Sequence, residues 1–108
     1  MKFVVYTTGT LAKSKVMRVS TLLNMLFKPE SIEVIDKPTA SKLSKMLKDG
    51  MFAVEVSASK TYSSQKEGVY QFDMSLDWIK QLNRLVGFVG TAPSDRVIQA
   101  ASNWYNSN

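Results

Sequence analysis

The sequence contains no cysteine and no histidine among its 108 residues. The missing thiols exclude disulfide bonds and thiol redox chemistry, and the missing imidazoles exclude Cys/His zinc sites and catalytic Ser-His or Cys-His pairs. No run approaches the roughly 18 consecutive apolar residues that a membrane span requires. The apolar stretch at residues 3–6 ends at Thr7, too early for a secretion signal, so we expect a soluble, cytoplasmic protein.

The rest of the composition is that of an ordinary globular protein, with 44% hydrophobic and 21% charged residues. This length predicts a single domain over residues 1–108 with a modest core. The charge is uneven, because residues 1–50 carry nine basic and four acidic side chains whereas residues 51–108 carry five of each. The excess of +5 therefore lies in the first half. It favours an anionic partner, or it merely solvates helix faces.

Four segments have the residue pattern of strands, and they cover residues 2–7, 32–36, 51–58 and 69–74. In the first segment both alternating sets of residues are apolar, which is typical of a strand covered on both faces. The last two segments are joined by a polar loop at residues 59–68. Such a pair predicts an antiparallel hairpin.

Four further segments have apolar residues at helical spacing, and they cover residues 16–27, 40–49, 76–86 and 93–105. Thr39 is the expected N-cap of the second helix and Gly50 its C′ residue. Ser75 is expected to cap the third helix, and residues 87–92 to form a loop or a short extended piece. The order β-α-β-α-β-β-α-α predicts an α/β sandwich with a four-stranded mixed sheet and an extra C-terminal helix.

Three stretches are similar to glutaredoxin segments: FVVYTTG at residues 3–9, SIEVID at 31–36 and VYQFD at 69–73. With the element order above, residues 2–86 resemble the thioredoxin fold in its short, glutaredoxin-like form, and residues 93–105 form an appended helix. The family has a Cys-x-x-Cys motif where this chain has Thr10-Leu11-Ala12-Lys13. The resemblance therefore implies a scaffold without oxidoreductase activity. Glutathione binding is not implied either, because the family's cis-proline is missing before the third expected strand.

Basic residues in three segments are candidate contacts for nucleic acid or another anion. Residues 9–15 place two lysines at a helix start, where backbone N–H groups favour anions, but they lack the Gly-Lys-Ser/Thr ending of a P-loop. The helix 40–49 has lysines at every third position, and the loop 59–68 has two lysines around a tyrosine that can stack on a base. In each segment the alternative is a solvated surface. These candidates are Lys13, Lys15, Lys42, Lys45, Lys48, Lys60, Tyr62 and Lys66.

Trp104 and Tyr105 in the last expected helix have two interpretations. Their rings pin this helix to the rest of the protein, or they form an exposed patch for a protein partner or for a second copy in a homodimer. The acidic residues suggest no catalytic role. Glu30, Glu33 and Asp36 cluster around the second strand, where paired carboxylates can bind a hard cation, but solvent exposure explains Glu33.

The sequence leads to two functional hypotheses. The first is a non-enzymatic protein-binding module, an accessory or inhibitory factor of a kind common among phage-encoded proteins, built on a redox-inactive thioredoxin-like scaffold. The alternative is a sequence-nonspecific nucleic-acid-binding protein that uses the basic residues of the N-terminal half. A phosphate or small-molecule site at residues 8–14 is a third option. No catalytic residue, cofactor or metal is expected.

Overall fold

The computed structural model describes residues 1–58 and 67–107, which form eight elements in the expected order. The strands are β1 (Lys2–Tyr6), β2 (Ser31–Val34), β3 (Phe52–Ser57) and β4 (Val69–Asp73). The helices are α1 (Lys13–Phe27), α2 (Ala40–Lys48), α3 (Trp78–Val89) and α4 (Asp95–Ser107). Each of these elements overlaps a segment expected from the sequence, with ends that differ by a few residues.

The four strands form one sheet in the order β2-β1-β3-β4, and every neighbouring pair is parallel. The predicted mixed sheet is therefore wrong, and so is the predicted antiparallel hairpin of β3 and β4. Ala53 pairs with Val69 and Ser57 with Asp73, so both strands begin at the same edge. Two short strands with a polar connection are a local signal for a hairpin, but the direction of the second strand depends on tertiary packing.

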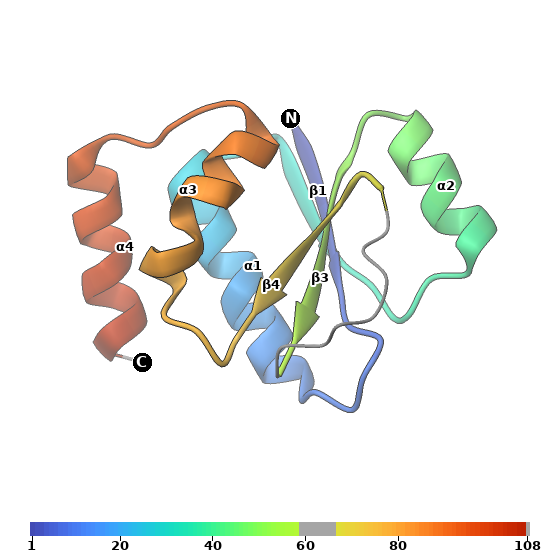
Figure 1. Ribbon diagram of the computed structural model, residues 1–108, viewed down its shortest axis with the longest axis horizontal. Helices are drawn as coiled ribbons and strands as arrows, with labels where there is room; N and C mark the ends of the chain where they lie inside the picture. Colours follow the sequence, from blue (N-terminus) through green and yellow to red (C-terminus); the bar gives the residue numbers. More distant parts are fainter. Residues whose placement is uncertain (59–66, 108) are drawn as a thin grey trace.

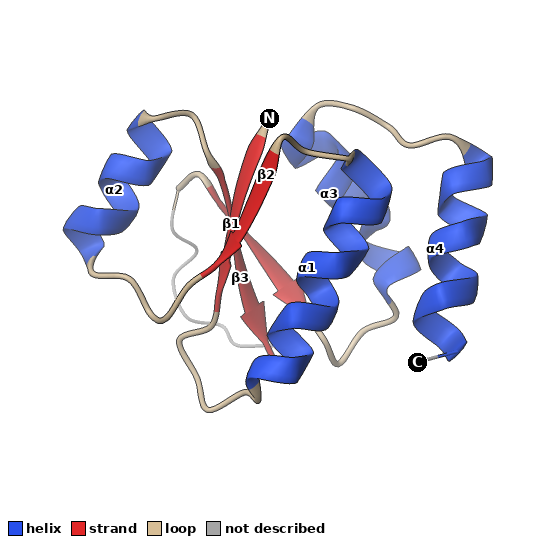
Figure 2. Cartoon of the chain, turned by 180° about the vertical axis from the view of Figure 1, so that it is seen from behind, coloured by secondary structure: helices blue, strands red, loops and turns tan. Residues whose placement is uncertain are grey.

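The helices lie on both faces of the sheet, with α1 and α3 on one face and α2 on the other (Figure 1). α4 lies beyond α1 and α3 as an outer layer, which Figure 2 shows from behind. The chain passes from β1 through α1 to β2 and then back across β1 through α2 to β3. This is a doubly wound arrangement whose strand order reverses at β1. The likeness to the thioredoxin fold, which implied a mixed sheet, stays a prediction.

The core lies on both sides of β1, whose residues 3–6 are fully buried, as the apolar residues on both alternating sets predict. The larger part of the core fills the space between the sheet and the helices α1 and α3. The smaller part lies under α2, where Leu43 packs with Val4, Tyr6 and Ala53. Leu43 is the buried residue that α2 contributes, and Met46 and Leu47 of the same helix are partly buried against this part of the core.

The ends of α2 follow the expected signals. The Thr39 hydroxyl accepts a hydrogen bond from the Lys42 backbone N–H at 3.2 Å, which caps the first turn. Gly50 follows the helix with a φ of 80°, a conformation that side chains with a Cβ rarely adopt. Both predicted roles are confirmed.

The ends of α3 differ from the expectation. Asp77, and not Ser75, is the N-cap, and its carboxylate accepts a hydrogen bond from the Ile79 N–H at 3.3 Å. The Ser75 hydroxyl instead donates to the Asp73 carboxylate at 2.6 Å. The helix continues into the predicted loop and ends before Gly90, whose φ is 90°. A glycine inside a helix costs only about 1 kcal/mol, so packing of the last turn can override the signal at residue 87.

Candidate functional site

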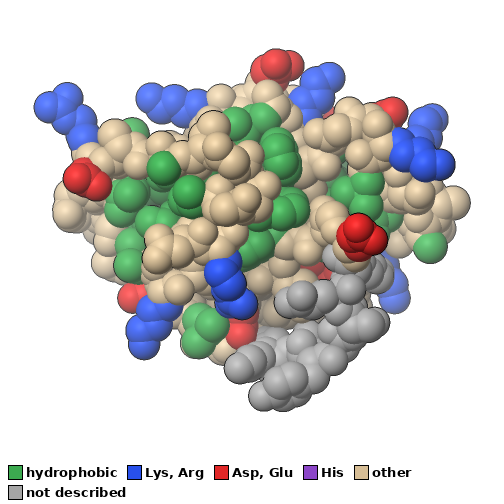
Figure 3. Space-filling view, turned by 45° about the horizontal axis from the view of Figure 1, so that its top comes forward, with side chains coloured by type: hydrophobic (Ala, Val, Ile, Leu, Met, Phe, Trp, Pro, Cys, Tyr) green, Lys and Arg blue, Asp and Glu red, His purple; other side chains and the backbone are tan. Residues whose placement is uncertain are grey.

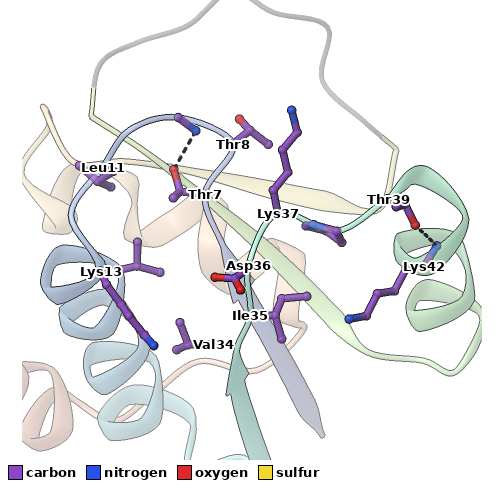
Figure 4. Close-up of a pocket in the computed structure, with 13 residues that line it drawn as sticks. Thr7, Thr8, Leu11, Lys13, Val34, Ile35, Asp36, Lys37, Thr39 and Lys42 are labelled. Atoms are coloured by element: carbon purple, nitrogen blue, oxygen red, sulfur yellow. Dashed lines mark hydrogen bonds between the residues drawn. The ribbon is translucent and has the colours of Figure 1, made fainter.

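A cleft of about 780 Å³ opens at the carboxyl ends of β1 and β2. Its walls are the loop that joins β1 to α1 and the loop that joins β2 to α2 (Figure 4). The two loops leave the sheet toward opposite faces, because α1 and α2 cover opposite faces. The space between them stays open, at the edge where doubly wound sheets bind their ligands.

Three lysines from separate segments line this cleft. Lys13 begins α1, Lys37 follows β2, and Lys42 lies in the first turn of α2. In Figure 4 the side chains of Lys13 and Lys42 extend into the space between the two loops, and Lys37 extends away from it at the rim. The fold therefore brings together basic residues that are far apart in the sequence.

The amino ends of two helices also face the cleft. Ala12 is the N-cap of α1, and no side chain caps this end by a hydrogen bond. The first turns, residues 13–16 and 40–43, contain no Asp or Glu. The partial positive charge at each helix start is thus not offset by an acidic side chain in that turn, and it adds to the charge of the lysines.

Asp36 is the acidic residue among the side chains that line the cleft. It is exposed, and it forms no ion pair with any residue in the described part of the chain. Figure 4 shows its carboxylate above the ends of Lys13 and Lys42, with one lysine on each side. The lining of the cleft therefore combines three lysines with one carboxylate, a group that accepts hydrogen bonds.

Hydrogen bonds to the buried Glu55 carboxylate of β3 hold the start of the β1–α1 loop. The Glu55 carboxylate in β3 is 8% exposed, and it accepts hydrogen bonds from the Thr8 hydroxyl at 3.0 Å and the Tyr6 hydroxyl at 3.3 Å. Burial, and then the charge of Glu55, raise the pKa of Tyr6 well above its ordinary value, so its hydroxyl remains a donor. In the loop itself the Gly9 N–H donates to the Thr7 hydroxyl at 3.3 Å. These bonds tie the loop to the centre of the sheet.

The sequence-predicted anion contacts fall into three groups. Lys13 and Lys42 line the cleft. Three others are exposed on the first turn of α1 or along α2 but do not line the cleft, and they are Lys15, Lys45 and Lys48. The remaining three lie outside the described residues, and they are Lys60, Tyr62 and Lys66.

Sequence reasoning missed Lys37 and gave Asp36 no role. Both residues follow the carboxyl end of β2, at the same edge of the sheet as the loop after β1. The first two strands are joined through a helix, an order that favours a parallel pair, and this order was the signal for the position of Lys37 and Asp36. Residues that follow neighbouring parallel strands meet at one edge.

The two aromatic residues of the last helix contact the rest of the protein. The Tyr105 ring lies 6.3 Å from the Trp78 ring and 4.0 Å from the Arg18 guanidinium carbon, measured from the Tyr105 ring centre. Trp104 and Tyr105 are both partly buried against the larger core. These contacts pin α4 to α1 and α3, while a role of either ring toward a partner stays a prediction.

Exposed apolar side chains occur near the start of α3. Leu76 is 39% exposed and Ile79 is 42% exposed. The view of Figure 3 brings forward the opposite end of this helix, where apolar side chains gather near the passage from α3 to α4 and Lys and Arg side chains project at the rim. Leu76 and Ile79 are not among the residues that line the cleft.

Comparisons of the chain with protein-family models, with curated proteins and with solved structures found no match. In the described part of the chain, no helix has both the length and the hydropathy needed to cross a bilayer. The described acidic residues form no group of three or more that is placed to hold a metal ion.

Proposed function

We propose that the protein binds a nucleic-acid strand through its phosphate groups, in the cleft between the β1–α1 and β2–α2 loops. The convergence of Lys13 and Lys42 on one cleft, with Lys37 at its rim, carries this proposal. Ammonium groups and free helix N–H groups are the partners that phosphate oxygens take in proteins. The protein acts in this proposal as a binding protein rather than as an enzyme.

The arrangement of charge beyond the cleft supports a polymer over a single phosphate. Lys45 and Lys48 are exposed on α2 after Lys42. At the rise of a helix they lie about 4.5 and 9 Å further along its axis, so positive charge continues away from the cleft. Lysines that contact phosphates position a strand without reading its bases, so the binding is nonspecific in sequence.

Fluorescence anisotropy with a labelled oligonucleotide tests this function. We expect Lys13→Gln combined with Lys42→Gln to weaken binding by roughly tenfold at low salt, because two phosphate contacts are lost. The slope of log affinity against log salt should also become shallower, by about 0.7 for each contact to a single strand. The control removes the same charge elsewhere, with Lys28→Gln at the end of α1 and Lys80→Gln on α3. Equal affinity of the two double variants would contradict the proposed site.

Protein binding is a second candidate function, and the exposed side chains of Leu76 and Ile79 favour it. The simplest partner for this apolar surface is a second copy of the chain. Sedimentation velocity over a range of concentrations should then detect a dimer that Leu76→Ser with Ile79→Ser abolishes. A wild-type protein that stays monomeric throughout would argue against self-association at this surface.

A further inference from the structure

We infer that the cleft distinguishes ribose from deoxyribose, with the Asp36 carboxylate accepting a hydrogen bond from a 2′-hydroxyl, so that the bound strand is RNA. This inference rests on the proposed function and names the strand that the same cleft takes. It depends on the position of one acidic side chain among three lysines.

The chemistry of a carboxylate limits what can lie beside Asp36. An ionised carboxylate accepts hydrogen bonds and donates none. If Asp36 lies next to a phosphate of the strand, it lowers the affinity of the cleft for that strand, because like charges repel. Facing a hydrogen-bond donor, it raises the affinity. The backbone of DNA has no such donor along its length, whereas every ribose of RNA has a 2′-hydroxyl.

The order of charges in the cleft matches the order of groups in a ribonucleotide strand. In Figure 4 the Asp36 carboxylate lies above the ends of Lys13 and Lys42, with one lysine on each side of it, and all three residues line the same cleft. A nucleic-acid backbone alternates phosphate, sugar and phosphate. A strand with its phosphates at the two lysines therefore places a sugar near Asp36.

The surroundings leave Asp36 available for this contact. It forms no ion pair with the described residues, although Lys13, Lys37 and Lys42 line the same cleft. The β1–α1 loop forms the other wall of the cleft, and the hydrogen bond between Thr8 and Glu55 ties this loop to β3. The wall opposite Asp36 is thus fixed before a ligand arrives, which lowers the entropic cost of binding.

The test compares labelled oligouridylate with labelled oligodeoxyuridylate of the same length, about ten nucleotides. The two probes carry the same base and the same phosphates, so a difference in affinity reports the 2′-hydroxyl. We expect the wild-type protein to bind the ribose strand about fivefold more tightly, the effect of an ordinary hydrogen bond and less than that of one to a buried charged group, because Asp36 is exposed.

Two substitutions separate the contact from a general charge effect. Asp36→Ala should bring the affinity ratio of the two strands close to one, with the deoxyribose strand bound more tightly than by the wild type. Asp36→Asn, which keeps the size of the side chain, should lower the ratio as well. Asp49→Ala is the matched control, because it removes the same charge just after the far end of α2, about 13 Å along the helix. Its ratio should equal that of the wild type.

The outcomes also separate the inference from the proposed function. Equal, salt-sensitive binding of both strands by the wild type would overturn the inference and keep the function. A preference for ribose that persists in Asp36→Ala would overturn the role of Asp36. Failure of the wild type to bind either strand at low salt would overturn both.

Discussion

The guanidinium of Arg18 lies 4.0 Å from the centre of the Tyr105 ring, and it donates a hydrogen bond to the backbone carbonyl oxygen of Tyr105. This pair joins α1 to the last turn of α4. Ala101, earlier on the same helix, is fully buried. The outer helix is therefore held both by apolar packing and by a cation that binds a ring and a carbonyl group.

Removing the Arg18 side chain should destabilise the protein. Arg18→Ala loses a cation–π contact and a hydrogen bond to a charged donor, and we expect the free energy of unfolding to fall by about 1–3 kcal/mol. Urea denaturation gives this value, and hydrogen exchange should show faster exchange in α4 before other helices. Arg96→Ala, an exposed position on α4, should change stability by less than about 0.5 kcal/mol. Equal effects of the two substitutions would contradict the assigned contact.

Gln81 is 1% exposed and bridges the end of β4 to α3. Its Nε2 donates to the Asp73 carbonyl oxygen at 2.9 Å, and its Oε1 accepts from the Asp73 N–H at 3.2 Å. Gln81→Leu keeps the bulk but removes both bonds. The Asp73 carbonyl oxygen keeps a hydrogen bond from the Leu76 N–H at 3.3 Å, whereas the Asp73 N–H loses its side-chain acceptor, so the substitution should cost about 1–3 kcal/mol. Asn83→Leu, on an exposed position of the same helix, is the control for introducing leucine. A loss no larger than that of the control in urea denaturation would show that water replaces these bonds.

Stability should fall at alkaline pH because of Tyr6. Its pKa in the folded protein is raised above the ordinary value of 10.0, first by burial and then by Glu55. The stabilising contribution is complete below about pH 10, where both states keep the proton, and is lost at higher pH as the unfolded chain releases it. The expected slope is about 1.4 kcal/mol per pH unit for this group.

Tyr6→Phe separates this contribution from the rest of the protein. The slope of stability above about pH 10 should become shallower in the variant but not vanish, since burial also raises the pKa of Tyr70. Near neutral pH the same variant should lose about 1–3 kcal/mol, because the buried Glu55 carboxylate loses a hydrogen-bond donor. Urea denaturation at several pH values measures both effects. An unchanged slope would assign the alkaline loss to other groups.

An acidic N-cap on α1 should raise the stability of the protein and weaken its binding to an oligonucleotide. Ala12 has the extended backbone of an N-cap, but its methyl side chain cannot accept a hydrogen bond from the first turn. Ala12→Ser and Ala12→Asp should each raise stability by about 1 kcal/mol. Only Ala12→Asp adds a negative charge beside the cleft, so only this variant should weaken oligonucleotide binding, by several-fold. Equal binding by the Ser and Asp variants would place the strand away from the start of α1.

Much of the fold could be predicted from local residue patterns, because the patterns report burial. The apolar residues on both alternating sets of β1 predicted its two covered faces, and Thr39 and Gly50 predicted the ends of α2. The direction of β4 could not be obtained in this way, since a strand has the same pattern in either direction. The wrong hairpin followed from that symmetry.

Only part of the candidate site could be predicted from the sequence. Lys13 and Lys42 were recognised as anion contacts within their own segments, but their meeting depends on the order of the strands. Lys37 and Asp36 had no local signal, because a charged pair after a strand is ordinary loop composition. Their place in the cleft follows from the parallel pairing of β1 and β2.

Because β1 and β2 run in the same direction, the residues that line the cleft lie in the loops after the strands and the residues that stabilise the core lie within them. Substitutions in the loops can therefore change binding without removing core contacts. The loops that follow these strands hold the exposed residues 8–10 and 36–37, whereas the strands between the helices hold the buried residues 3–6 and 53–56. Glu55 links the two sets through its bond to Thr8. A library randomised at residues 9, 10, 36 and 37 should therefore change what the cleft binds while most members still fold, which makes this small sheet a ready framework for evolving new anion specificities.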